Sequence, residues 1–376
     1  MKTVLESPLT LGIIVCYGNK NRRPPFSEAA FFQQLTQVGK GLGIQVIVFS
    51  PRHIDWKTRT VPAWFVEANS GWGTGIKPLP SLIYDRCFYL DTRHYMAYKP
   101  YVQRIAQDPH IRLLGRALGG KHQTYEILKQ SPVIKPFLPP TTRYQTPQDL
   151  IRLLKRHGSL LIKPNGGSHG RGVAAITLHP RGHYEVRGRS RANEPFQHSV
   201  QNEEKLQMWA QQFIQDTRYI IQPFLSLFTP DRRPFDLRIL VQKNERKEWE
   251  TTGTAVRIGK AGTVTSNLHG GGQATSLRPF LDQHYPAKQV PPILEKIEKV
   301  SSAVPPFIEV HHGPLLELGL DVGIDLQGRV WLLEVNSKPG RTIFLKTGEM
   351  KIRQRAVQLP MFYAHSLLKG HLGGSV

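Results

Sequence analysis

The sequence predicts an α/β domain with a parallel sheet at the N-terminus, followed by a mixed, largely antiparallel α+β region. The chain has 376 residues, which is enough for two or three domains. An apolar run at 10–17, a helical pattern at 27–38 and a second apolar run at 44–49 form a β-α-β opening, which is typical of parallel sheets. Beyond residue 140, short strand patterns follow one another with few helices between them, which indicates antiparallel pairing.

Within the first region, Ser27 is expected to cap the first helix and the glycines at 39–43 to end it. Segments 81–89 and 111–114 are predicted as further strands of the same sheet. The aromatic and glycine-rich passage 56–80 is expected to be irregular loop, or short strands without an assigned place.

A helix is predicted at 121–129, and the proline-rich segment at 132–140 after it is expected to be a stiff linker that marks a domain boundary. The second region begins with the helix predicted at 147–157. Residues 320–336 are predicted as a hairpin and 371–376 as a frayed tail. Helices are further predicted at 147–157, 201–215, 293–303 and 351–368, and strands at 160–163, 172–178, 183–187, 219–225, 235–242 and 250–258.

Composition places a strong positive charge on a folded protein. Fifty Lys and Arg against 28 Asp and Glu give a net charge of +22, which attracts nucleotides, acidic peptides or other anionic polymers, or which only keeps the protein soluble. The basic residues are spread along the chain, so a nucleic-acid partner rests on charge alone. Two cysteines are too few for a disulfide framework, and no segment approaches membrane-spanning length. We therefore expect a soluble, cytoplasmic protein.

The hairpin at 320–336 carries the most informative polar residues. Glu334 and Asn336 lie two apart on one predicted strand and so share a face, and Asp321 on the partner strand reaches the same face if the turn falls at 327–328. Three oxygen ligands without Cys or His suit Mg²⁺, which usually keeps nucleotide phosphates as further ligands. The alternative is an ordinary hairpin whose polar residues lie on a solvent-exposed face.

A glycine-rich loop follows the strand that ends at Lys163. Glycines permit unusual φ angles and allow backbone N–H groups to approach a phosphate, so the loop is predicted to be a phosphate lid rather than merely a flexible hairpin. Its Lys precedes the glycines, which excludes a Walker A loop. The residues expected to take part are Gly167, Ser168, Gly170, Arg171 and Gly172.

Three further segments carry weaker signals. Lys121 begins a helix and adds a second ammonium, or is only solvated. The strand at 219–225 contains a proline, which leaves it an edge strand or frees its backbone for a purine edge. Asp236 and Arg238 share a strand face, either as a surface pair or with the Arg directed at a transferring phosphoryl group.

The order of these segments resembles the ATP-grasp superfamily over residues 110–345. The Asp321…Glu334-x-Asn336 pattern, with Pro339-Gly340 after it, resembles the D-alanine–D-alanine ligase and glutamate-ligase branches. Segment 266–269 is similar to the ribosomal-protein glutamate ligases, and segments 235–238 and 331–340 resemble the YheC/YheD-like endospore coat-associated proteins.

The resemblance implies an ATP-grasp fold behind an N-terminal parallel α/β domain, with domains at 1–115 and 116–376. The second would contain a lid-like subdomain at 140–225, a metal and catalytic core at 226–345 and a C-terminal helix at 351–368. It also implies roles for single residues. Lys121, Lys163 and the loop at 166–172 would bind ATP phosphates; Gln222, Phe224 and Leu225 would form the adenine hinge; Asp321, Glu334 and Asn336 would hold Mg²⁺, with two ions; Arg238, Arg257, Asn267 and His269 would face the transferring phosphoryl group. Asp231 is the nearest acidic residue for the ribose.

Two functions stay open at this point. The first is an ADP-forming carboxylate–amine ligase that works through an acyl phosphate on an anionic peptide or polymer during sporulation. The second is a spore-coat-associated structural or binding protein that keeps an ATP site without turnover. No Ser-His-Asp or Cys-His pattern supports covalent catalysis.

Overall fold

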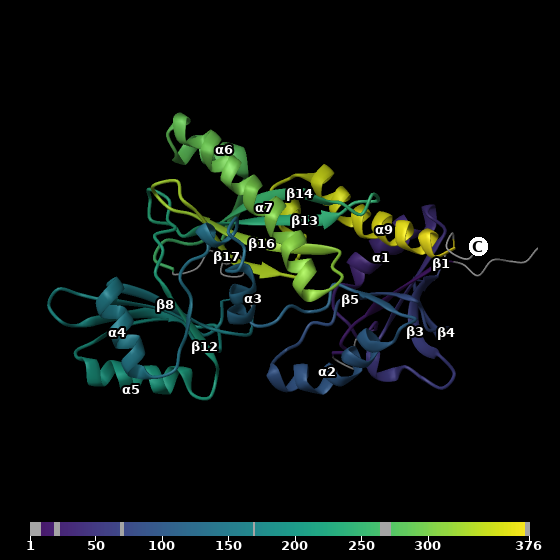
Figure 1. The fold of residues 1–376 in the computed structure, drawn as a ribbon, viewed down its shortest axis with the longest axis horizontal. Coiled ribbons are helices and arrows are strands. Elements are labelled where there is room, and N and C mark those ends of the chain that lie inside the picture. The colour runs from purple at the N-terminus through teal and green to yellow at the C-terminus, as the bar shows by residue number, and fades with distance from the viewer. Residues whose placement is uncertain (1–8, 19–22, 68–70, 168–169, 264–271, 373–376) are drawn as a thin grey trace, which may run out of the picture.

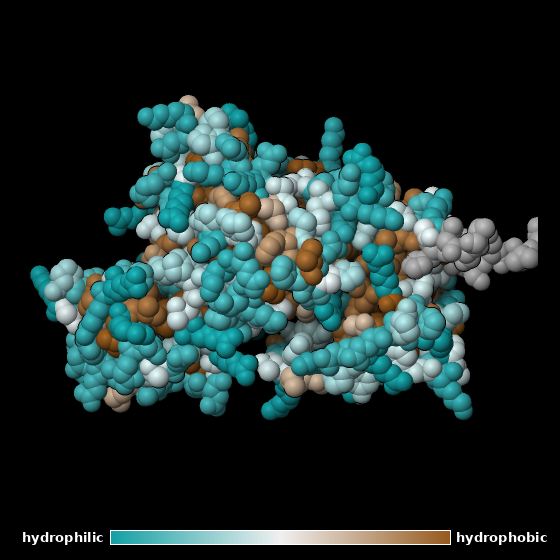
Figure 2. All heavy atoms as spheres, viewed as in Figure 1, coloured by the Kyte–Doolittle hydropathy of each residue, from teal (hydrophilic) through white to brown (hydrophobic). Residues whose placement is uncertain are grey.

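The computed structural model describes residues 9–18, 23–67, 71–167, 170–263 and 272–372. Across these residues the strands form three sheets, here called the N-terminal, middle and C-terminal sheets in chain order (Figure 1). The visible face is mainly hydrophilic, with an indentation between the lobes of the middle and N-terminal sheets (Figure 2). None of the helices in the described ranges combines the length and apolar character needed to cross a membrane.

The N-terminal sheet has a parallel part and an antiparallel edge. Its order is β4-β3-β2-β1-β5-β6, with β1 (Leu9–Ile14), β2 (Ile44–Phe49), β5 (Leu82–Asp85) and β6 (Arg112–Leu114) parallel, and the hairpin β3 (Thr60–Glu67) and β4 (Gly71–Pro78) at the edge. The β-α-β opening is confirmed by α1 (Ala29–Gly41) between β1 and β2. Passage 56–80 therefore contains strands rather than only loop.

Two details of this region differ from the expectation. Helix α1 follows Glu28 rather than a Ser27 cap, and Glu28 has a left-handed φ of 62° with its carboxylate bound to Arg86 instead of to the helix. Helix α2 (Thr92–Gln107) was not predicted, because Pro100 lies inside it and its buried positions are few. Asp91 caps α2 by accepting a hydrogen bond from the His94 N–H.

The middle sheet is antiparallel and has helices on one face only. Its order is β11-β10-β9-β8-β12-β7, made by β7 (Thr142–Arg143), β8 (Ser159–Pro164), β9 (Val173–Leu178), β10 (Tyr184–Arg189), β11 (Pro195–Val200) and β12 (Tyr219–Pro223). Leu160 and Ile162 pack in one apolar cluster with α4 (Pro147–His157) and α5 (Glu203–Ile214). The alternating positions, among them Leu161, Lys163 and Arg187, project from the opposite side, here called the open face.

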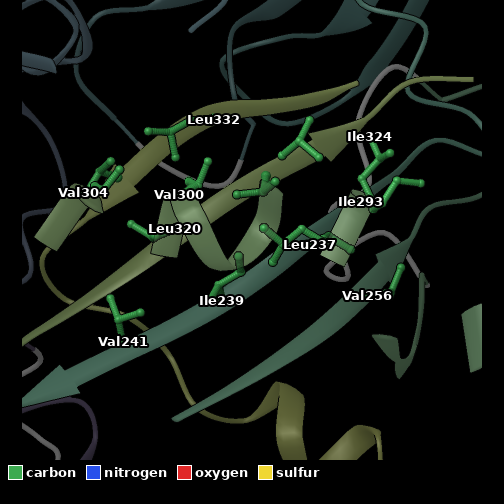
Figure 3. Packing of buried hydrophobic residues seen from close by; sticks show 14 of the residues in the cluster. Leu237, Ile239, Val241, Val256, Ile293, Val300, Val304, Leu320, Ile324 and Leu332 are labelled. Carbon is green, nitrogen blue, oxygen red and sulfur yellow. The ribbon is translucent and has the colours of Figure 1, made fainter. Parts of the chain in front are cut away.

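The C-terminal sheet is covered by helices on both sides, but unequally. Its order is β15-β14-β13-β16-β17, made by β13 (Phe235–Lys243), β14 (Trp249–Ile258), β15 (Gln273–Ser276), β16 (Glu317–Ile324) and β17 (Val330–Asn336). On one side Leu237, Ile239 and Leu320 pack against α7 (Val290–His312), as Figure 3 shows, together with α3 (Lys121–Leu128) and α6 (Leu277–His284). On the other side, α8 (Ile343–Lys346) and α9 (Met350–Leu372) cover only one end.

Helix α9 joins the C-terminal sheet to the N-terminal sheet. Ala356 packs with Leu240 of the C-terminal sheet, whereas Val357 and Met361 belong to the same buried cluster as Leu11 of β1. The two sheets therefore share one helix at their junction.

A buried charge network crosses the same junction. The carboxylate of Glu317, at the start of β16, is fully buried. It accepts hydrogen bonds from Tyr84 Oη, Arg86 Nη1 (3.0 Å), Gln242 Nε2 (2.9 Å) and Arg341 Nη2. Arg86 also donates to Glu28, at 2.6 and 2.9 Å. Two carboxylates thus compensate two guanidiniums, which is the condition for keeping charges out of water.

Candidate functional site

A charged row crosses the uncovered end of the C-terminal sheet. Arg238 on β13 lies opposite Asp321 on β16, which lies opposite Glu334 on β17, and Asp236 lies opposite Arg257 on β14. Residues directly opposite one another in antiparallel strands share a face, so all five side chains project on the same side. The hairpin β16–β17 closes as predicted, and it brings Asp321 beside Glu334.

Ion pairs between strands hold this charged row together. Arg238 binds Asp321 through two hydrogen bonds, Nε to Oδ1 at 2.7 Å and Nη2 to Oδ2 at 3.3 Å. Arg257 Nε donates to Asp236 Oδ1 at 2.7 Å, and its Nη2 lies 3.1 Å from Asp321 Oδ1. Burial opposes ionisation of Asp321, but the two guanidiniums outweigh it and lower the pKa of its carboxyl group. Asp321 is therefore a carboxylate held between two arginines.

The proposed metal ligands occupy neighbouring positions of this row. Asn336 lies two residues beyond Glu334 and opposite Gly319. A side chain at position 319 would place its Cβ 2.8 Å from Pro339 Cβ and 3.4 Å from Arg238 Nη1, so this position requires glycine. No group of three His, Cys, Asp or Glu side chains suited to a metal occurs in the described part of the chain. Two carboxylates and one amide form a partial set of oxygen ligands, which fits Mg²⁺ shared with phosphate oxygens.

Both predicted lysines reach this row from outside the C-terminal sheet. Lys121 Nζ, at the start of α3, lies 3.2 Å from Glu334 Oε1 and donates to the Gly167 carbonyl at 3.0 Å. Lys163 Nζ, on the open face of the middle sheet, lies 3.5 Å from the Leu333 carbonyl. The pairing of β16 with β17 is irregular at this point, and Leu333 is left without an opposite residue. The open face and the charged row therefore face each other.

Asn165 connects the two lysines and was not predicted. Its backbone carbonyl accepts from the Lys121 N–H, and its side-chain Oδ1 accepts from the His122 N–H, both at 2.8 Å. The residue therefore caps α3 from the loop that directly follows the strand of Lys163. No sequence signal links a loop Asn to a helix more than 40 positions away.

The ammonium of Lys163 is destabilised by its surroundings. Burial lowers the pKa of Lys163 to about 8, against an ordinary value of 10.5; Glu334 and Asp321 raise it and Lys121 lowers it further. A phosphate bound at this ammonium would restore the missing compensation.

Binding of ATP at pH 8 is therefore expected to take up protons. Free Lys163 is about half protonated there, and bound phosphate favours the charged form, so uptake should reach up to about half a proton and affinity should fall from pH 7 to 9. Calorimetry in two buffers of different ionisation enthalpy measures the uptake. Lys163→Arg, which stays cationic, is the control and should abolish it. Equal heats for the wild type in both buffers would contradict the role of Lys163.

The glycine-rich loop has the backbone that its composition predicts. Gly167, Gly170 and Gly172 have φ angles of 100°, 69° and 67°. A Cβ at Gly172 would also lie 2.8 Å from Tyr219 Oη, so this position is closed to larger residues. Arg171 is exposed, and Ser168 lies outside the described residues. Lys121 contacts the loop through Gly167, which brings the phosphate-binding candidates of two segments together.

The proposed adenine hinge is a strand end with a free backbone edge. The ladder between β12 and β7 includes only Ile220 and Ile221, so it stops before Gln222. Gln222 is 7% exposed, its side chain donates to Thr141 Oγ1 at 2.7 Å, and its backbone is paired with Leu161 of β8, so the free edge beyond the ladder belongs to Pro223. Phe224 and Leu225 are half-buried beyond it, and Asp231 lies on an exposed turn. Of the remaining candidates, Asn267 and His269 lie outside the described residues.

A contact at the junction with the N-terminal sheet also escaped prediction. Lys338, two residues after Asn336, donates to Asp85 Oδ1 at 2.7 Å and to the Cys87 carbonyl at 2.8 Å. Asp85 ends β5, so this lysine fixes the segment after the metal-ligand candidates to the carboxyl end of a parallel strand. The partners are some 250 positions apart, which no local pattern reveals.

Two solved enzyme structures share this fold, and one of them is named an ATP-grasp ligase. The D-cycloserine synthetase DcsG aligns with 96% of this chain and 99% of its own, with a TM-score of 0.55 and 11% identity. The ATP-grasp ligase PsnB, solved with a minimal precursor, Mg and ADP, aligns with 95% of this chain and 98% of its own, with a TM-score of 0.53 and 10% identity. At such low identity the likeness establishes the fold, and the predicted ATP-grasp fold is confirmed.

Sequence relatives narrow the family. The endospore coat-associated protein YheC of Bacillus subtilis (strain 168) is 32% identical over 323 residues, covering 85% of this chain and 87% of YheC. YheD of the same organism is 27% identical over 347 residues, covering 91% of this chain and 75% of YheD. The family model described as YheC/D-like ATP-grasp matches residues 110–367. Fold, sequence and motif order agree, and the chain belongs to the YheC/D-like ATP-grasp family.

Proposed function

We propose that this protein is an Mg·ATP-dependent carboxylate–amine ligase that forms ADP. The observation that carries the proposal is the meeting of Lys121 and Lys163 with the charged row at Glu334. Two ammonium groups and several hard oxygen ligands directed at one place suit a nucleotide triphosphate with its metal. Keeping so many charged groups together is costly unless a ligand completes the set.

The nucleotide would lie between the open face and the charged row. Lys121 and Lys163 would neutralise its phosphates, and the loop at 166–172 would cover them. The strand end formed by Gln222, Phe224 and Leu225 would receive the adenine. Asp321, Glu334 and Asn336 would hold two Mg²⁺ ions, and the metal would supply charge neutralisation at the phosphoryl group. Asp231 is the candidate for the ribose.

The chain's own contribution to the reaction would be positioning and charge compensation. A substrate carboxylate oxygen attacks the γ-phosphorus of ATP, ADP leaves, and an acyl phosphate forms. An amine then attacks the acyl carbon, and phosphate leaves with formation of an amide. Arg238 and Arg257 lie beside Asp321 and so are suited to contact the oxygens of the transferred group; Asn267 and His269 are proposed for the same place.

Domain roles follow from the packing. Leu128, Ile134 and Leu138 belong to the apolar cluster of the C-terminal sheet, which supports a boundary near residue 115 rather than at the linker. We assign residues 1–115 to an N-terminal domain and 116–376 to the ATP-grasp domain, with 140–225 as its lid.

The net charge of +22 favours an anionic peptide or polymer as substrate. By analogy with YheC and YheD, we place the protein in the cytoplasm during sporulation, in association with the endospore coat.

A second candidate is a coat-associated protein that binds ATP without turnover. The coat association of the relatives favours it, as does the pairing of Asp321 with two arginines, which already compensates this carboxylate. The two candidates share the nucleotide site and differ only in turnover.

Calorimetric titration with ATP, with and without Mg²⁺, tests the shared site, and ADP release with a panel of amino acids and acidic peptides tests the ligase. Saturable Mg-dependent binding with amine-stimulated ADP release supports the ligase. Binding without ADP release for any substrate pair favours the coat-associated binding protein. Absence of ATP binding contradicts both.

A further inference from the structure

Arg187 lies on the open face in line with the proposed adenine hinge. It is opposite Ala175 on β9, which is opposite Leu161 on β8, which is opposite Gln222 on β12. These four residues form one row across the middle sheet, and they share a face. Because α4 and α5 pack on the other face, no helix of the middle sheet covers this row.

The guanidinium of Arg187 has an aromatic neighbour but no polar one. Its Cζ lies 5.7 Å from the ring centroid of Phe224, the first residue after β12. Among the described residues it makes no hydrogen bond or ion pair, although it is half-buried. Nearby arginines are satisfied: Arg189 donates to the side chain and the carbonyl of Asn193 at 2.8 and 2.7 Å, and Arg191 donates to the Ile214 carbonyl at 2.6 Å.

A half-buried cation with only a ring beside it is poorly compensated. Contact with an aromatic face offsets part of the free-energy cost of losing hydration. A second aromatic surface on the free side of the guanidinium would offset more of it. The planar guanidinium stacks on rings in a way that an ammonium does not. Arg187 is therefore suited to a flat aromatic ligand.

The position of Arg187 along the open face indicates whether it would lie near the phosphates or near the base of a bound nucleotide. Lys163 lies in the next row, two residues along β8 towards the glycine-rich loop, at a spacing of about 6.7 Å. Arg187 and Phe224 lie towards the hinge instead, on the side away from that loop. The phosphates belong to the row of Lys163, and the base belongs to the row of Arg187.

We infer that Arg187 binds the base of the nucleotide, with its guanidinium stacked on a purine ring that also contacts Phe224. This inference rests on the proposed nucleotide site and deepens it, because it assigns a residue that selects the base. Arg187 acts in binding and takes no part in phosphoryl transfer.

The test compares ATP with inorganic tripolyphosphate, which carries the phosphates without the base. Both are titrated calorimetrically with Mg²⁺ into the wild type, Arg187→Ala and Arg187→Lys. Arg187→Ala should weaken ATP binding about 5- to 30-fold, the range of a desolvated cation–π contact, and leave tripolyphosphate binding unchanged within about twofold. Arg187→Lys should recover only part of the loss. Arg181→Ala is the matched control, because Arg181 is an exposed arginine in the turn between β9 and β10, and this variant should bind both ligands as the wild type does.

The outcomes distinguish failure of this inference from failure of the proposed nucleotide site on which it rests. Unchanged ATP binding by Arg187→Ala, with a wild type that binds ATP, overturns the inference and leaves the nucleotide site standing. An equal loss of ATP and tripolyphosphate binding also overturns it, because Arg187 then acts on the phosphates. A wild type that binds neither ligand overturns the nucleotide site and the inference together. Arg187→Met keeps the length of the side chain and repeats the test if the alanine variant does not fold.

Discussion

Exchanging Glu334 for Gln and Asn336 for Ala together should lower the Mg-dependent affinity for ATP by at least about 100-fold. Both side chains project from the uncovered end of β17, and the only ion pair of Glu334 in the described structure is with Lys121. Their loss removes two of the three proposed oxygen ligands and leaves the sheet intact. Asp321 is a poorer choice, because its removal would also release Arg238 and Arg257.

Calorimetric titration with ATP, with and without Mg²⁺, measures this effect, and the far-ultraviolet circular dichroism and thermal midpoint show that the fold is kept. Gln327→Ala is the matched control, since it lies at the turn of the same hairpin and its side chain is exposed. The control should bind Mg·ATP as the wild type does. A double variant with wild-type affinity would remove the metal assignment.

Exchanging Glu317 for Gln should lower the free energy of unfolding by about 3–5 kcal/mol, the usual cost of leaving a buried charge without its partner. Arg341 is almost fully buried and has Glu317 as its carboxylate partner, whereas Arg86 keeps Glu28. Burial disfavours the Arg341 guanidinium, and Glu317 is the main group that raises its pKa against that effect. The amide of a Gln offers no compensating charge.

Urea denaturation followed by fluorescence measures the change. Glu295→Gln, on the exposed side of α7, is the control and should stay within about 0.5 kcal/mol of the wild type. Adding Arg341→Met to Glu317→Gln should restore part of the lost free energy of unfolding, because it removes the unpaired cation. If Glu317→Gln alone costs less than about 1 kcal/mol, the network does not hold the junction as its burial indicates.

The sequence predicts those parts of the fold whose signal is local. The hairpin containing Asp321 and Glu334, its turn and the shared face of its polar residues could be predicted, whereas the irregularity that leaves Leu333 without an opposite residue could not. The glycine-rich loop is likewise predicted by composition, because positive φ angles are a property of single residues.

The missing parts depend on partners remote in sequence. β11 and the β3–β4 hairpin have no clean alternation, since glycines, prolines and half-buried aromatics occupy them, and they are ordered by the sheets they extend. The partners of Arg257 and of Lys338 are fixed by strand order, which the sequence does not state. Arg187 belongs to no sequence motif, and its proposed role depends on its alignment with Gln222 across four strands of the middle sheet.

Helix α9 has a consequence for how the chain is made in the cell. The N-terminal sheet reaches its complete core only when Val357 and Met361 pack beside Leu11, yet β2 ends at Phe49. At a synthesis rate of about 5–20 residues per second, the interval between these segments lasts about 15–60 s. The first sheet to leave the ribosome is thus among the last to be closed, and for that interval its apolar side is available to chaperones and to neighbouring chains.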